Sequence, residues 1–298
     1  QFMTSVGLAT LLRSQSLFQH ASRAAAMSLE ALRGSRSPFF EGIHRVRPHG
    51  GQIEVAQQLV SLLGSGPASE IAQSHERCDR VQDAYSLRCV PQVHGACWDA
   101  LNFVKGKLEI EMNSVTDNPL VFPDENLIVS GGNFHGEPIA MALDFLGIAL
   151  AEMASISLER INKLMNPEFS KLPPFLVRNG GLHSGLMMLQ TSAAALVSEN
   201  KTLAHPAVVD SIPNQNDKED HVSMGAWAAM KAKKIESNTR RVLAMELIAG
   251  AQGLEFLRPL KSTPAVEECH AWVRQVSPPY DLDRSLSAEI EALAERLA

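Results

Sequence analysis

Residues 134–165, FHGEPIAMALDFLGIALAEMASISLERINKLM, decide the fold class of this chain. Proline occurs only near the start of this stretch, where a helix tolerates it because the first N–H groups have no intrahelical partner. Apolar side chains recur at the spacing of a helix face: Ile139, Leu143, Leu146, Leu150, Met153 and Ile161. At 1.5 Å per residue, the stretch predicts one helix roughly 45 Å long.

Two further stretches, residues 2–32 and 221–253, predict helices of similar length. Shorter helices are predicted at 53–63, 92–112 and 183–203, and a small hairpin at 120–122 and 127–129. Residues 38–51 and 68–91 are expected to be irregular connections. Long helices joined by short polar turns predict an all-α protein, a bundle of long antiparallel helices. Their apolar faces are broad and rich in Ala and Met, so we expect an oligomer.

The domain organisation follows from where the long helices end. We expect residues 1–258 to form a central long-helix bundle domain that is incomplete at its N-terminal side. Residues 259–298 are expected to add peripheral short helices to the same domain. The chain starts Gln1-Phe2-Met3 and enters a helical pattern at once, as if it began part way through a protein.

Composition narrows the class of function. A formal net charge of −6 argues against nucleic acid as the main partner. The four cysteines form no CxxC pair and the histidines no HExxH pattern, so the sequence favours reduced thiols, a cytoplasmic location and no metal. We expect no membrane partner, because no uninterrupted apolar run is long enough to span a bilayer.

Four polar segments at predicted helix ends are candidates for chemistry: residues 82–88, 116–118, 131–134 and 214–221. Arg88 suits a carboxylate, Glu219 an amine or imidazole, and Phe134 a ring. Each has a structural alternative. Arg88 could pair with a carboxylate of the protein and Phe134 could pack in the core. Tyr85 could also simply pack, Asn118 could only shape a turn, and Asp217 with Asp220 could cap the following helix.

Six blocks of sequence resemble one family in consistent order. They are QDAYSLR (82–88), TDNPL (116–120), SGGNFHGEP (130–138), LPPFL (172–176), SENK (198–201) and EDHVSMG (219–225). These blocks resemble the aromatic amino acid ammonia-lyases, and most of all the members that act on histidine. The resemblance implies the all-α architecture of the fumarase/aspartase superfamily and a homotetramer whose active sites are each built by several subunits. It also implies 4-methylidene-imidazol-5-one (MIO), an electrophile that forms from an internal Ala-Ser-Gly.

The resemblance also implies roles for individual residues. Tyr85 would lie beside the electrophile and take part in proton transfer, with Gln82 hydrogen-bonding nearby. Arg88 would bind the substrate carboxylate, close to Asn118.

The side-chain part of the pocket would be formed by other residues. Phe134 would shield the electrophile and contact the substrate, and Glu219 would face the substrate amine or imidazole as an acid, base or orienting group. Met187 stands where phenylalanine-specific members tend to carry Lys, which favours histidine as the substrate and urocanate as the product.

The chain departs from the family pattern in one respect, because it contains no Ala-Ser-Gly. It therefore resembles the C-terminal portion of such an enzyme and is expected to be inactive without the N-terminal part. Two alternatives stay open. One is a tyrosine or phenylalanine ammonia-lyase or aminomutase, and the other is a catalytically silent helical assembly subunit.

Overall fold

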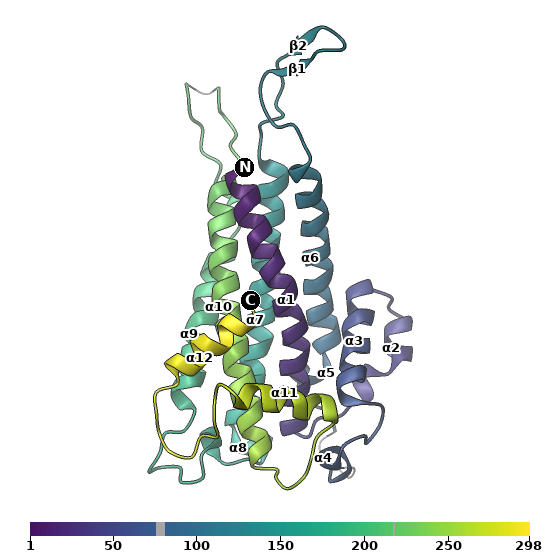
Figure 1. The fold of residues 1–298 in the computed structure, drawn as a ribbon, viewed down its shortest axis with the longest axis vertical. Helices are drawn as coiled ribbons and strands as arrows, with labels where there is room; N and C mark the ends of the chain where they lie inside the picture. Colours follow the sequence, from purple (N-terminus) through teal and green to yellow (C-terminus); the bar gives the residue numbers. More distant parts are fainter. Residues whose placement is uncertain (76–80, 217) are drawn as a thin grey trace.

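The computed structural model describes residues 1–75, 81–216 and 218–298, and its regular structure is helical apart from one two-stranded sheet (Figure 1). The five longest lie side by side along the long axis of the molecule: α1 (Phe2–Ala31), α6 (Val90–Met112), α7 (Glu137–Met165), α9 (Met187–Leu203) and α10 (Gly225–Glu255). The predicted all-α bundle is confirmed. Its core is formed mainly where α1, α7 and α10 contact one another.

Helix α7 is the central element. It begins at Glu137 and not at Phe134, with Pro138 in its first turn. It ends before Pro167, because a residue that precedes proline favours extended backbone and Asn166 has φ −91° and ψ 111°. Leu143, Leu146 and Leu150 are fully buried.

By length and composition alone, α7 could cross a membrane, contrary to what we expected from the sequence. In the fold, however, 67% of its most apolar window is buried. Its hydrophobicity is therefore accounted for by its place in the core.

A group of short elements packs beside the lower part of α6. These are η1 (Ser37–Phe39), α2 (Glu41–Arg45), α3 (Gly50–Leu63), α4 (Glu70–Gln73) and α5 (Tyr85–Arg88). The irregular connections expected at 38–51 and 68–91 thus contain helical turns, and α3 starts three residues earlier than predicted. Asp99 of α6 accepts a hydrogen bond from the Gly51 N–H at 2.8 Å, so a neighbouring helix supplies the missing partner of the first turn of α3.

The bundle has two distinct ends. At one end, the hairpin of β1 (Leu120–Phe122) and β2 (Leu127–Val129) projects beside residues 211–216 and 218–224, and we call this the hairpin end (Figure 1). The predicted strands are confirmed, with Leu120 opposite Val129. The opposite end carries α5, α8 (Pro167–Ser170) and η2 (Pro174–Leu176), and we call it the α5 end. The short η3 (Val208–Asp210) follows α9.

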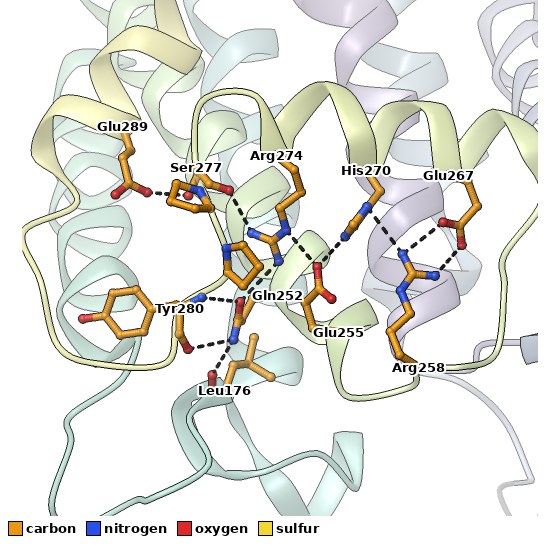
Figure 2. A network of polar contacts seen from close by, with 12 residues as sticks. Leu176, Gln252, Glu255, Arg258, Glu267, His270, Arg274, Ser277, Tyr280 and Glu289 are labelled. Carbon is orange, nitrogen blue, oxygen red and sulfur yellow. Dashed lines mark hydrogen bonds and ion pairs between the residues drawn. The ribbon is translucent and has the colours of Figure 1, made fainter.

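The last two helices, α11 (Pro264–Arg274) and α12 (Ser287–Arg296), cross the outside of the bundle (Figure 1). A polar network holds α11 against the last turns of α10 (Figure 2). In it, Arg258 donates two hydrogen bonds to Glu267, and Glu255 accepts from both His270 and Arg274. The division of the chain at residue 258 stays a prediction.

Candidate active site

The predicted residues Gln82, Tyr85 and Arg88 lie together at the α5 end. Tyr85 is the first residue of α5 and is 71% exposed, so its ring is not packed in the core of this chain. The Arg88 guanidinium lies over the Tyr85 ring, 4.8 Å from its centroid, and its Nε donates to the main-chain carbonyl of Asp83 at 3.0 Å. A phenol and a cation therefore share one exposed turn.

Gln82 and Arg88 also line an open groove of about 1810 Å³. The groove is also lined by residues of η1, α2 and α3, among them His44, and by Phe40 between η1 and α2. The hydrogen bonds of His44 suit its neutral ring, because Nδ1 accepts a hydrogen bond from the Gln52 amide and Nε2 donates one to the Pro38 carbonyl. Burial lowers the pKa of His44, and the hydrogen bond to Pro38 only partly opposes this. The groove therefore offers Arg88 as a cation that an anionic ligand can reach.

The predicted residues of the hairpin end lie on exposed loops. The side-chain oxygen of Asn118 accepts hydrogen bonds from Gly131 N at 2.8 Å and from the Ser130 hydroxyl at 3.1 Å. Asn118 thus shapes the turn that positions Phe134. Phe134 itself is 58% exposed, which rules out the alternative of a core residue.

Glu219 lies in the neighbouring loop, paired with Asn214 through two main-chain hydrogen bonds. Helix α10 starts at Gly225 after Met224, which adopts the left-handed conformation, so Asp220 lies too far upstream to cap it. Asp217, the other predicted cap, lies outside the described residues.

A pair of histidines connects these two loops, and sequence reasoning did not assign it a role. The rings of His135 and His221 are stacked, with centroids 5.8 Å apart and planes inclined by 8°. His135 Nε2 lies 2.9 Å from the His221 carbonyl, and Glu137 N donates to its Nδ1 at 3.4 Å. In a neutral ring, these two partners match the tautomer with the proton on Nε2. The sequence did offer a signal for this pair, because His135 follows Phe134 directly and His221 lies two residues after Glu219.

Met187, the predicted substrate-selecting residue, begins α9 and is 37% exposed. It lies near the α5 end, because Gln190, one turn further on, donates to Asn162 close to the end of α7. Met187 therefore lies at the same end of the bundle as Tyr85 and Arg88, and not at the end that carries Glu219.

Within one chain the two groups of predicted residues do not meet. Tyr85 and Arg88 precede α6, whereas Asn118 follows it. The 23 residues of α6 alone separate the two ends by about 35 Å. One end offers a cation and a phenol, and the other a carboxylate and an aromatic ring. No group of three His, Cys, Asp or Glu side chains in the described ranges could hold a metal ion.

Comparison with known proteins identifies the class to which this arrangement belongs. The aromatic amino acid lyase family matches residues 1–275, and the chain belongs to that family. Histidine ammonia-lyase from Bos taurus is 52% identical over 298 residues, which are 100% of this chain and 45% of that protein. The predicted family membership is confirmed.

Solved structures agree with the sequence comparison. Histidine ammonia-lyase from Trypanosoma cruzi matches with a TM-score of 0.91 and 47% identity, covering 100% of this chain and 56% of that one. Tyrosine aminomutase from Streptomyces globisporus also gives 0.91, with 38% identity over 99% of this chain and 59% of that one. The chain spans about half the length of the curated relatives it matches, from 44% to 58%.

Proposed function

We propose that this chain supplies residues to the active site of an ammonia-lyase that converts L-histidine to urocanate and ammonia. The observation that carries the proposal is the match to histidine ammonia-lyase from Bos taurus at 52% identity over the whole chain. In the reaction a β-proton and the amino group leave the substrate, and a carbon–carbon double bond forms. This chain is also 38% identical to a tyrosine aminomutase, so tyrosine is the second candidate substrate.

The two ends of the bundle would bind different parts of the substrate. At the α5 end, Arg88 would hold the substrate carboxylate through its planar fork, while the Tyr85 hydroxyl exchanges a proton and Gln82 donates a hydrogen bond nearby. Met187 would lie beside this group.

At the hairpin end, Phe134 would cover one face of the substrate ring. Glu219 would accept a hydrogen bond from the substrate amine or imidazole, and Asn118 would keep its loop in place. Each of these side chains is exposed, as a ligand-binding role requires.

The chain does not carry the tripeptide from which MIO forms, because Ala-Ser-Gly is absent from its 298 residues. When present, MIO supplies an electrophile that activates the substrate amine for departure. The proposal therefore includes an N-terminal part of the same protein that brings this group, and the 298 residues alone would be inactive. A cytoplasmic location of the complete protein is part of the proposal, supported by the absence of a CxxC pair among the four cysteines of the sequence.

Assembly is the second part of the proposal. Because the two ends are about 35 Å apart in one chain, a complete site requires the α5 end of one copy beside the hairpin end of another. Neighbouring bundles would run antiparallel, in a homotetramer. Exposed apolar side chains in the hairpin half supply a surface for this contact: Phe103, Met141, Phe145, Ile148, Trp227 and Met230.

The test of the function is turnover by the complete protein. Histidine should give rising ultraviolet absorbance from urocanate, with tyrosine and phenylalanine as control substrates. Turnover of tyrosine or phenylalanine alone would assign the site to the alternative, a tyrosine or phenylalanine ammonia-lyase or aminomutase. If none of the three reacts although the upstream part carries Ala-Ser-Gly, the lyase proposal fails. The test of the assembly is the molar mass in solution, where a monomer would exclude the shared site.

A further inference from the structure

A fully buried ion pair lies directly beneath α5. Arg160 of α7 and Glu246 of α10 have no exposed side-chain surface. Arg160 donates to both carboxylate oxygens, from Nε at 2.5 Å and from Nη2 at 2.9 Å. The hydroxyls of Ser28 on α1 and Ser157 on α7 donate to the same carboxylate at 2.8 and 2.5 Å. Three long helices thus meet at one carboxylate.

Such a pair needs an explanation other than stability. Removing two charges from water has a cost that their attraction often only offsets, and apolar residues of similar size can replace buried pairs without loss of stability. Here the charges are well satisfied, because both fork nitrogens and two hydroxyls reach Glu246. The third nitrogen of the Arg160 guanidinium, Nη1, does not bond to Glu246.

That nitrogen reaches the turn on which the candidate site is built. Arg160 Nη1 lies 3.4 Å from the main-chain carbonyl of Ser86, which stands between Tyr85 and Arg88. Ser86 and Leu87 are buried whereas Tyr85 is exposed, so α5 rests on the bundle with its phenol facing outward. A guanidinium fixed on its other side by a carboxylate gives this carbonyl a donor that cannot rotate away.

A buried histidine next to the pair stays uncharged. His94 of α6 is fully buried, and neither of its ring nitrogens has a hydrogen-bond partner among the described residues. Burial, together with the charge of Arg160, holds the pKa of His94 well below its usual range. His94 therefore does not compete as a cation with Arg160 for Glu246.

We propose that Arg160, oriented by Glu246, is a positioning residue that fixes the α5 turn and with it the directions of the Tyr85 hydroxyl and the Arg88 guanidinium. The effect on turnover rests on the proposed function. The effect on the Tyr85 side chain does not, since it concerns this chain alone.

The experiment removes the pair in one step from the complete protein. In the double variant Arg160→Met/Glu246→Met, neither charge is left unpaired, so the fold is expected to survive. Ser28 and Ser157 can then donate to carbonyls of their own helices. The matched control is Asp144→Leu/Lys231→Met, which removes another buried pair between α7 and α10 with the same kind of change.

The main readout is fluorine NMR of protein labelled with 3-fluorotyrosine, with the Tyr85 signal assigned by Tyr85→Phe. The parent and the control should show one Tyr85 line of the same shift and width, whereas the double variant should show a broadened or split line. Its kcat should fall at least about tenfold with the melting temperature retained. An unchanged Tyr85 line together with unchanged kcat and KM would overturn the proposal.

A second variant covers the case in which the double variant does not fold. Arg160→Lys keeps a cation for Glu246, but a single ammonium cannot span both Glu246 and the Ser86 carbonyl. It should alter the Tyr85 line in the same way, and an unchanged line would count against the role of Arg160. A parent without histidine turnover would refute the proposed function, whereas the Tyr85 line would still test the positioning.

Discussion

The two ends of the bundle hold their polar residues in different ways. At the α5 end, the turn that carries Tyr85 and Arg88 rests on buried residues, and its main chain accepts a hydrogen bond from Arg160 in the core. At the hairpin end, Asn118 and Glu219 are exposed and bond mainly to other atoms of their own loops. The α5 turn is therefore held by a residue of the helix bundle, whereas Asn118 and Glu219 are held mainly by the loops in which they lie.

This difference indicates how a complete site would be built. A turn fixed on rigid helices can present a cation and a phenol in a defined geometry. Loops that project from the end of a bundle gain a defined environment when another surface covers them. The predictions below test whether the two ends act together across copies and how strongly each is held.

The largest effect is expected from two variants that each damage one end of the bundle, tested alone and then together. In the complete protein, Tyr85→Phe and Glu219→Gln should each lower kcat roughly 100-fold or more, because each removes a proton-transferring or orienting group. Coexpressed in equal amounts, the two variants should recover about a quarter of the parent activity if each site takes its two ends from different copies. The measurement is urocanate formation by the mixed tetramer. No recovery would place both ends of a site in one copy.

A smaller effect is expected within the α5 end. Arg88→Lys keeps the charge but replaces a bidentate fork with a single ammonium, so KM for histidine should rise about tenfold with little change in kcat. Steady-state kinetics measure both constants. The control is Arg47→Lys, at an exposed position in the loop before α3. A KM equal to that of the parent would remove Arg88 from the carboxylate-binding role.

At the hairpin end we expect a weaker response to the loss of one contact. His135→Phe keeps a ring against His221 but removes the donor to the His221 carbonyl. The value of one hydrogen bond predicts a roughly two- to tenfold loss in kcat/KM. His49→Phe, at an exposed site, is the matched control. If His135→Phe behaves like this control, the two loops do not depend on the histidine pair.

The smallest effect concerns acid stability, and it should appear at the α5 end, where α11 is attached (Figure 2). Burial lowers the pKa of His270 and outweighs its hydrogen bond to Glu255. The unfolded chain therefore takes up the proton first, and the stability contributed by neutral His270 is lost as the pH falls below the usual value of 6.5.

Glu255 acts in the same direction at lower pH. Burial raises its pKa, but the hydrogen bond from His270 and the charge of Arg274 outweigh burial, so the net pKa is lowered. Its contribution is present above the usual value of 4.5 and is lost below it. Hydrogen exchange should show α11 opening between pH 6.5 and 5 before the helix ends near the hairpin do. His270→Gln should flatten this dependence, and simultaneous opening of both ends would contradict it.

Much of the fold could be predicted because its signals are local. The apolar spacing of residues 139–161 and the position of Pro138 define α7 within a few residues, and the strands of the hairpin were found at their observed positions. The start of α3 was missed because its first turn is completed by Asp99, 48 residues further along the chain. A partner that distant leaves no mark in the local pattern.

The candidate site could be predicted only in part. Tyr85, Arg88 and Phe134 were singled out because polar or aromatic residues at helix ends stand out in a sequence, and the structure places all three at accessible positions. Their roles, which the resemblance implies, stay predictions. These residues lie at two ends because α6 runs the length of the bundle between them. Sequence motifs alone do not show how far apart the residues that carry them lie in the fold. Arg160 and Glu246 were missed because each reads as one charged residue in a long helix, and their meeting depends on how α7 and α10 pack.

The buried pair of Arg160 and Glu246 has a consequence for the synthesis of the chain. Arg160 leaves the ribosome 86 residues before Glu246, an interval of about 4–17 seconds at the usual rates of translation. During this time α7 has neither its counter-charge nor the covering helix α10, although it is among the most apolar segments of the chain. We therefore expect α7 to be the segment of the nascent chain that chaperones protect, until the carboxylate that completes its burial has been made.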